Sequence, residues 1–213
     1  MSQSQAAIRR KLLAAARLAA PAYARNGRAL PPAWFMTDPK RTPHPDRIAA
    51  RLPRSFGVIF RHFGAKDRFE AGRKLATVCR TRRLVLLVSA DPAFARAIGA
   101  DGVHWPEARL RGVRPRHPRW METSSAHTPR SIGRAARLGV DAVILSTVFS
   151  SNSTSAEKPV GATRFRTFAA RSPLPVYALG GVTAGNAARV LNGARRRAAG
   201  WAAIDAVMSG WGD

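Results

Sequence analysis

The chain has 213 residues, 46% of them hydrophobic and 23% charged, and its 36 Lys and Arg against 12 Asp and Glu give a formal net charge of +24. A chain of this length and apolar content buries a sizeable core as one domain, which excludes a disordered protein. Apolar runs such as Leu84 to Ala90 are far shorter than the roughly 20 residues of a membrane-spanning helix. We therefore expect a globular, cytoplasmic protein.

The excess of positive charge raises the question of nucleic-acid binding. The basic residues, 31 Arg and 5 Lys, occur in nearly every segment instead of gathering on one helix or stripe, whereas a nucleic-acid footprint concentrates on one face. We therefore expect no nucleic-acid partner and favour a small anionic ligand. The single cysteine, Cys79, excludes an internal disulfide bond and is expected in the core.

Residues 1–30 are basic and contain no acidic residue. Their apolar positions recur at helical spacing and predict an amphipathic helix over residues 6–20, ending at Pro21. Such a helix binds a membrane surface or covers an apolar part of its own domain, and the alanine-rich apolar face favours the second reading. The apolar positions are Ile8, Leu12, Leu13, Ala16 and Ala19.

After Pro31, short apolar runs alternate with helical patterns. Strands are expected at 34–37, 57–61, 84–89, 102–105, 120–124, 142–148, 175–179 and 201–204. Helices are expected at 46–52, 67–80, 92–98, 129–138, 162–170 and 183–191, with an irregular link at 107–117. Strands that alternate with helices indicate right-handed crossovers and a parallel sheet.

Eight such units predict an α/β fold, a (β/α)8 TIM barrel over residues 31–213 with residues 1–30 as an N-terminal extension. A doubly wound sheet would have fewer strands and a glycine-rich turn after the first strand, and no such turn follows Asp38. Only nine residues follow Ile204. We therefore expect a truncated eighth helix, with the N-terminal helix covering the barrel surface that the truncation leaves bare.

Functional groups of a barrel lie where its strands end. His104 and His127 end the fourth and fifth strands, where each is a proton carrier or else a core or capping histidine. Gly180 and Gly181 end the seventh strand and form either a phosphate cradle or a plain turn. The Ser/Thr-rich segment 146–155 is expected to form a loop that either closes over the ligand or is an ordinary solvated loop. Further expected ligand-binding residues are Arg61, Ser125, Lys158 and Ile204.

Four strings in this order resemble the thiamin phosphate synthase family and its TenI-type thiazole tautomerase relatives. They are AIGADGVH over residues 97–104, SAHT over 125–128, VF at 148–149 before the Ser/Thr loop, and LGGV over 179–182 with Asn186. The resemblance covers residues 33 to 207 and implies a (β/α)8 barrel. It also implies a small phosphorylated heterocycle as the partner, and it leaves a homodimer open.

The resemblance implies that synthases use Mg²⁺ bound by two aspartates, and both positions differ in this chain. The first is Ala90 and the second is Arg109, so we expect no metal and no cofactor. The strand-two motif keeps Arg61 but has Phe63 where the family has a lysine. The last strand ends Ile204-Asp205 where the family has Val-Ser, and a carboxylate there repels a phosphate unless it pairs with an arginine.

Three functions remain open from the sequence. The favoured one is a metal-free tautomerase in which His127 is the general acid and base, because that reaction needs no metal. The second is thiamin phosphate synthase, which joins a pyrimidine diphosphate to a thiazole phosphate and releases diphosphate. The third, from a different class, is a barrel that binds a ligand or polyanion without turnover through its basic surface.

Overall fold

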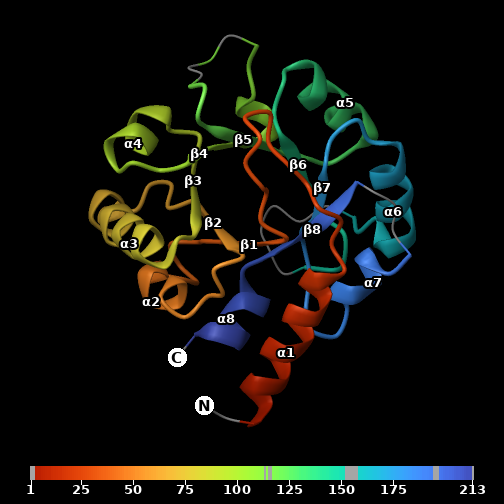
Figure 1. The fold of residues 1–213 in the computed structure, drawn as a ribbon, viewed down its shortest axis with the longest axis horizontal. Coiled ribbons are helices and arrows are strands. Elements are labelled where there is room, and N and C mark those ends of the chain that lie inside the picture. The colour runs from red at the N-terminus through yellow and green to blue at the C-terminus, as the bar shows by residue number, and fades with distance from the viewer. Residues whose placement is uncertain (1–2, 113, 115–116, 152–157, 194–196, 213) are drawn as a thin grey trace.

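Eight parallel strands close into a barrel in which β1 pairs with both β2 and β8 (Figure 1). This computed structural model describes residues 3–112, 114, 117–151, 158–193 and 197–212. It confirms the predicted (β/α)8 architecture. The strands are β1 (Ala33–Met36), β2 (Phe56–Phe60), β3 (Val85–Ser89), β4 (Gly102–Trp105), β5 (Met121–Ala126), β6 (Ala142–Leu145), β7 (Val176–Ala178) and β8 (Ala198–Ala203).

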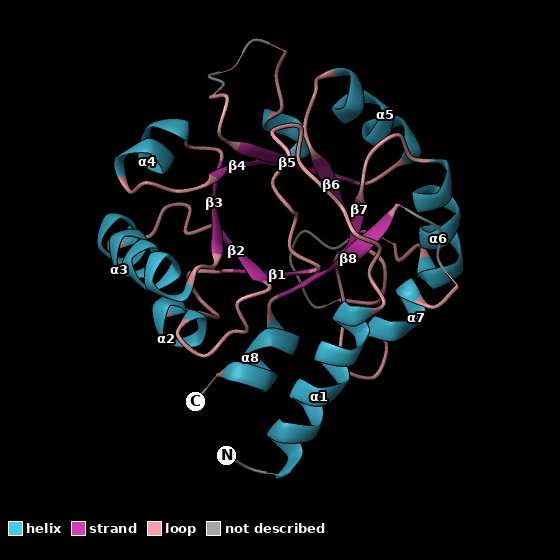
Figure 2. Ribbon diagram, in the orientation of Figure 1, coloured by secondary structure: helices cyan, strands magenta, loops and turns pink. Residues whose placement is uncertain are grey.

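Helices surround the ring of strands (Figure 2). They are α2 (Pro45–Ala49), α3 (Arg68–Arg82), α4 (Pro92–Ala97), α5 (Pro129–Arg137), α6 (Gly161–Arg171) and α7 (Ala187–Leu191), with a 3₁₀ turn η1 (Glu107–Arg109) after β4. Two of these helices begin at polar caps, since Asp91 Oδ1 accepts from Phe94 N at 2.9 Å and Thr128 Oγ1 from Ser131 N at 3.1 Å. Among the described residues, no helix is long and apolar enough to cross a membrane.

Alternation along each strand divides the core into two layers. Phe35 and Val58 belong to the layer between the strands and the helices, whereas Trp34, Ile59 and Leu87 belong to the interior of the barrel. Side chains therefore fill the ring. This packing leaves the carboxyl ends of the strands as the place for a ligand.

The eighth helix is short, as predicted: α8 (Asp205–Trp211) has seven residues. The N-terminal helix α1 (Gln3–Arg17) packs against α7 and α8, so it covers this part of the barrel (Figure 1). Leu12 is fully buried in that contact, and Gln5 Nε2 donates to the carbonyl oxygen of Gly212 at 3.0 Å. The helix begins and ends three residues earlier than predicted.

The rest of the N-terminal extension was not foreseen from the sequence. Tyr23 and Ala29 pair antiparallel, and Ala22, Ala24 and Leu30 join the apolar cluster of the barrel interior. The backbone N–H and Nε of Arg25 both donate to Asp141 Oδ1 at 2.9 Å. Three side chains of residues 22–30 therefore join the apolar cluster of the barrel interior while the rest of the segment is exposed, and α1 packs against the helices α7 and α8.

Candidate functional site

Two cavities lie where the strands end, and they share Arg61, Ser146 and Leu179 in their walls. We call the first the glycine cavity: it has a volume of about 450 Å³, and its walls include Gly180, Gly181, Ile204 and Asp205. We call the second the histidine cavity: it has a volume of about 640 Å³, and its walls include His104, Ser125, His127 and Arg109. The shared walls make the two cavities neighbours in one mouth of the barrel.

The turn at Gly180 and Gly181 accepts only glycine. Both residues have positive φ, +91° and +60°, and a Cβ on Gly180 would lie 2.7 Å from Thr147 Cγ2 while one on Gly181 would overlap the carbonyl oxygen of Ser150. The N–H groups of Gly180, Gly181 and Val182 have no hydrogen-bond acceptor within the described ranges. This turn therefore presents backbone donors at a cavity wall, which suits an anion.

The helix after this turn begins later than predicted. We expected a helix from Thr183, whose N-terminus would add positive potential, but α7 begins at Ala187 and has five residues. Asn186 explains the difference, because its Oδ1 accepts from Thr183 N at 2.8 Å and its Nδ2 donates to the Gly181 carbonyl at 2.9 Å. These side-chain bonds hold residues 181–186 as a loop. The helix N-terminus therefore gives no support to this site.

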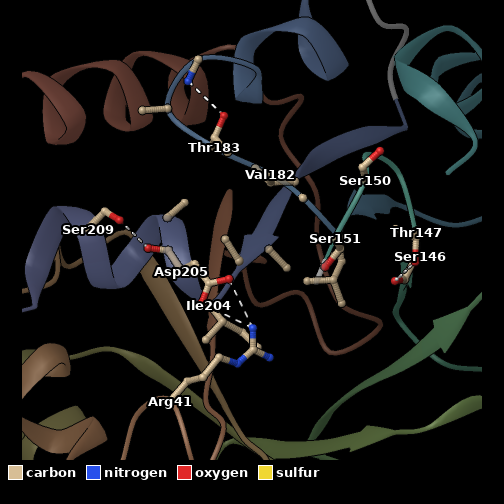
Figure 3. Close-up of a pocket in the computed structure, with 18 of the residues that line it drawn as sticks. Arg41, Ser146, Thr147, Ser150, Ser151, Val182, Thr183, Ile204, Asp205 and Ser209 are labelled. Carbon is tan, nitrogen blue, oxygen red and sulfur yellow. Dashed lines mark hydrogen bonds and ion pairs between the residues drawn. The ribbon is translucent and has the colours of Figure 1, made fainter. Parts of the chain in front are cut away.

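Asp205 does not stand alone at the glycine cavity. Arg41, from the loop after β1, places Nη1 3.3 Å from Asp205 Oδ2 and 3.4 Å from Oδ1 (Figure 3). Both residues line the cavity. Of the alternatives that the sequence left open for this carboxylate, the structure shows the pairing with an arginine.

His104 lies inside β4 with both ring nitrogens in hydrogen bonds. Its Nδ1 is 2.9 Å from Thr123 Oγ1 and its Nε2 is 3.0 Å from Ser125 Oγ. Burial, together with the nearby charge of Arg61, lowers its pKa to about 3. A ring held in this way stays neutral at physiological pH. It suits a fixed wall of the histidine cavity and not the proton carrier that the sequence left open.

His127 follows β5 and is partly exposed to the histidine cavity, with 29% of its side chain accessible. Its Nδ1 lies 2.9 Å from the carbonyl oxygen of Ser146. A carbonyl oxygen only accepts, so Nδ1 carries the proton and Nε2 is the nitrogen that exchanges one. Glu107 Oε2 accepts from the backbone N–H of His127 at 3.1 Å and lies 4.0 Å from Nε2.

Of the three cations Arg61, Arg109 and Lys158, the first two line a cavity and the third does not. Arg61 lines both cavities. Burial is the main cause that lowers its pKa; the charge of Arg41 also lowers this pKa, and the charge of Asp38 raises it. Arg109 lines the histidine cavity with its guanidinium 5.2 Å from the centre of the Phe63 ring. Lys158 is exposed and lines neither cavity. Of the predicted loop 146–155, residues 152–155 lie outside the described part of the chain.

The side chains at the expected metal positions do not fit Mg²⁺. That ion takes oxygen ligands, and it is held in proteins mainly by carboxylates. Ala90 offers no side-chain oxygen, Arg109 brings a positive charge, and within the described ranges no three His, Cys, Asp or Glu side chains gather closely enough to hold an ion. We therefore assign no step to a metal.

Sequence reasoning missed three contributors to this site. Only its position in the chain could have identified Arg41, which lies four residues after Thr37, the end of the first predicted strand. Thr123 lies two residues before Ser125 on the same face of β5, so strand alternation would have placed both beside His104. The Ser146 carbonyl that orients His127 is backbone and leaves no mark in the residue types.

A family model described as thiamine monophosphate synthase (TMP-TENI) matches residues 44–207. A putative thiamine-phosphate synthase 2 from Aquifex aeolicus is 30% identical over 130 residues, covering 59% of this chain and 70% of that protein. The thiamine-phosphate synthase of Haloarcula marismortui is 30% identical over 135 residues, covering 60% of this chain and 64% of that protein.

Among solved structures, the thiamine phosphate pyrophosphorylase of Pyrococcus furiosus is similar with a TM-score of 0.68, at 23% identity, over 84% of this chain and 88% of that one. That likeness concerns the fold. Some matched relatives are much longer than the aligned part, which spans only 40% of the Synechocystis thiamine-phosphate synthase. Because the family model covers most of the barrel, the chain belongs to the thiamine monophosphate synthase/TenI family of thiamine biosynthesis.

Proposed function

We propose that this protein catalyses a metal-independent proton transfer on a thiazole phosphate-like ligand, as TenI-type tautomerases do. The observation that carries the proposal is the orientation of His127. Its Nδ1 donates to the Ser146 carbonyl, and the proposal gives Nε2, on the other side of the ring, the uptake and release of a proton at the histidine cavity. A tautomerase needs one such group, because the proton removed from one ring atom returns to another.

The neighbouring cavity supports the binding half of the proposal. The donors of the Gly180–Gly181 turn and the guanidinium groups of Arg41 and Arg61 suit the phosphate of the ligand. Ser146 and Leu179 belong to both cavities. A ligand with its phosphate in the glycine cavity thus has a route for its ring toward His127, and no cofactor enters the reaction.

Thiamin phosphate synthase is the second candidate, and the names of the relatives favour it. That reaction releases diphosphate, whose charge a metal ion offsets by several kcal/mol. Arg61, Arg109 and Arg111 line the histidine cavity and supply positive charge there, but Ala90 and Arg109 replace the carboxylates expected to hold the ion. The residues present therefore favour proton transfer over synthesis.

Two assays on the purified full chain decide between these candidates. In the first, a thiazole phosphate tautomer is incubated with protein in EDTA, and conversion is followed by NMR. In the second, pyrimidine diphosphate and thiazole phosphate are supplied with Mg²⁺, and thiamin phosphate is measured. We expect turnover only in the first assay. Thiamin phosphate formed at an ordinary enzymatic rate would establish the synthase, and turnover in neither would leave a binding protein.

A further inference from the structure

We infer that Arg41 is the residue that binds the anionic group of the ligand in the glycine cavity, and that Asp205 is its counter-ion while the cavity is empty. The inference deepens the proposed function, because it names the side chain that would hold the phosphate. It concerns binding alone and needs no turnover. Four observations support it: the fixed backbone of Arg41, the long and exposed ion pair, the charge balance of the cavity, and the donors opposite.

The backbone that carries Arg41 is held in a turn. Asp38 Oδ1 accepts from the backbone N–H groups of Lys40 at 3.0 Å and Arg41 at 3.1 Å, and Asp38 N donates to Thr42 Oγ1 at 2.8 Å. Thr42 is almost fully buried. Such a turn fixes the point from which the long Arg41 side chain extends. Only the guanidinium has to move when the residue changes its partner.

The guanidinium contacts of Arg41 are suited to exchange. Its distances to Asp205 and to Asp38 Oδ2 are 3.3 to 3.4 Å, longer than those of a strong charged hydrogen bond. The Asp205 side chain is 71% exposed and that of Arg41 is 31% exposed. Ion pairs with such exposure are weak because water competes for both charges. A phosphate that accepts two N–H groups in a more enclosed site is the stronger partner.

The charge balance of the cavity favours an anion. Arg41 and Arg61 both line it, and Asp205 is the only carboxylate among the described residues of its wall. The two cations repel each other, and the charge of Arg41 adds to burial in lowering the pKa of Arg61. A ligand anion between them would relieve this repulsion.

The donors of the glycine turn belong to the same cavity. Gly180, Gly181 and Val182, whose N–H groups have no acceptor within the described ranges, line the same cavity that Arg41 borders. Figure 3 shows Arg41 directed toward Asp205 beneath Val182 and beside Ile204. An anion at this place would receive backbone bonds from one side and the guanidinium from the other.

The test measures binding of inorganic phosphate to the full chain by titration calorimetry at fixed ionic strength. We expect Arg41→Gln to weaken phosphate about tenfold, the scale of one lost charged hydrogen bond. Asp205→Asn releases Arg41 from its counter-ion and should tighten phosphate severalfold. The matched control is Arg47→Gln, an exposed arginine of α2 outside both cavity walls, which should leave the affinity unchanged.

The double variant Arg41→Gln/Asp205→Asn distinguishes an exchange of partners by Arg41 from a general effect of charge on phosphate binding. If Asp205 acts through Arg41, Asp205→Asn should tighten phosphate in the wild type but much less in the Arg41→Gln background. Equal effects in both backgrounds would overturn the exchange between the two residues. An unchanged affinity in Arg41→Gln, or no phosphate binding by the wild type, would overturn the site itself.

The phosphate-binding test can succeed or fail independently of the proposed proton transfer. Phosphate binding that responds as expected, in a protein that transfers no proton in the thiazole assay, would retain Arg41 as the anion-binding residue and reject the tautomerase. Proton transfer that persists in the Arg41→Gln variant with an unchanged KM would retain the tautomerase and reject Arg41 as the anion-binding residue.

Discussion

The imidazole of His127 and the carbonyl group of Ser146 are joined by a hydrogen bond of 2.9 Å between Nδ1 and the oxygen. The bond links the residue after β5 to the residue after β6, so the closed order of the strands brings the two together. It selects the tautomer with the proton on Nδ1. The proposed function makes Nε2 the acid and base atom, and a substitution that keeps the Ser146 bond tests this role.

His127→Asn is that substitution, because its amide nitrogen can still donate toward Ser146 while no group replaces Nε2. We expect the rate of thiazole tautomerisation to fall by about 10² to 10⁴, the usual contribution of a general acid and base, with KM changed little. The control is His44→Asn, an exposed histidine before α2. A variant with more than a tenth of the wild-type kcat would remove His127 from the chemistry.

His104 should not titrate in the physiological range. Burial lowers its folded pKa to about 3, below the value near 6.5 in the unfolded chain. The unfolded chain therefore binds more protons below about pH 6.5, and stability that is fully present above that pH is lost as the pH falls toward 3. We expect ¹⁵N shifts of the His104 ring to stay constant from pH 8 to pH 5. A midpoint near 6.5 would contradict the neutral, enclosed ring.

The same depressed pKa should appear in unfolding experiments. Between pH 6.5 and 4 the wild type should lose up to about 3 kcal/mol of unfolding free energy through His104, a loss that the His104→Gln variant lacks. His44→Gln, at an exposed histidine, should follow the wild type. Urea titrations at several pH values measure the three slopes, and equal slopes for His104→Gln and the wild type would reject the assignment.

Gly181→Ala should disturb the glycine cavity more than its backbone angle alone requires. The residue has a φ of +60°, which costs a non-glycine residue about 1 kcal/mol, and its Cβ would also overlap the Ser150 carbonyl. Gly27→Ala is the control, since φ is +79° and the added Cβ meets nothing within 4 Å. We expect a larger fall in urea midpoint for Gly181→Ala and loss of phosphate binding only there. Equal effects would mean that the turn is not closely packed.

The barrel was predictable because most of its strands are short apolar runs that alternate with helical patterns, although β5 has the mostly polar sequence METSSA. Strand alternation would also have placed Thr123 beside His104, since both were in predicted neighbouring strands. Helix bounds were less predictable than the strands. The first turn of the helix predicted from Thr183 is a loop, because Asn186 bonds back to Thr183 and Gly181, and the helix begins only at Ala187.

The partners of the charged residues also could not be predicted from the sequence. The sequence predicted that Asp205 repels phosphate unless it pairs with an arginine, but the pattern of a strand end could not identify that arginine as Arg41, 164 positions away in the chain. Lys158 was predicted as a ligand contact from its position near a loop, and the structure leaves it exposed outside both cavities. The residue types near the strand ends therefore predict which side chains can lie at the mouth of the barrel. The direction in which a long side chain points can be known only from the structure.

The N-terminal helix should be part of the folding unit and not an independent attachment. Leu12 of α1 is fully buried where the helix packs on α7 and α8, and Ala15 and Ala16 are buried beside it. Leu12→Ala removes that contact and should lower the unfolding free energy by about 2 to 5 kcal/mol, the range for buried leucines. Leu18→Ala, in a leucine that is 47% exposed just after the helix, should cost no more than about 0.5 kcal/mol.

Urea unfolding followed separately by tryptophan fluorescence and far-ultraviolet circular dichroism distinguishes the two arrangements. If α1 unfolds with the barrel, both signals should give one transition, and Leu12→Ala should shift both midpoints together. An early loss of helical signal with an unchanged fluorescence midpoint would show that the extension detaches on its own. Because α7 follows the glycine turn and α8 follows Ile204, a cooperative result would also tie the extension to the stability of the glycine cavity.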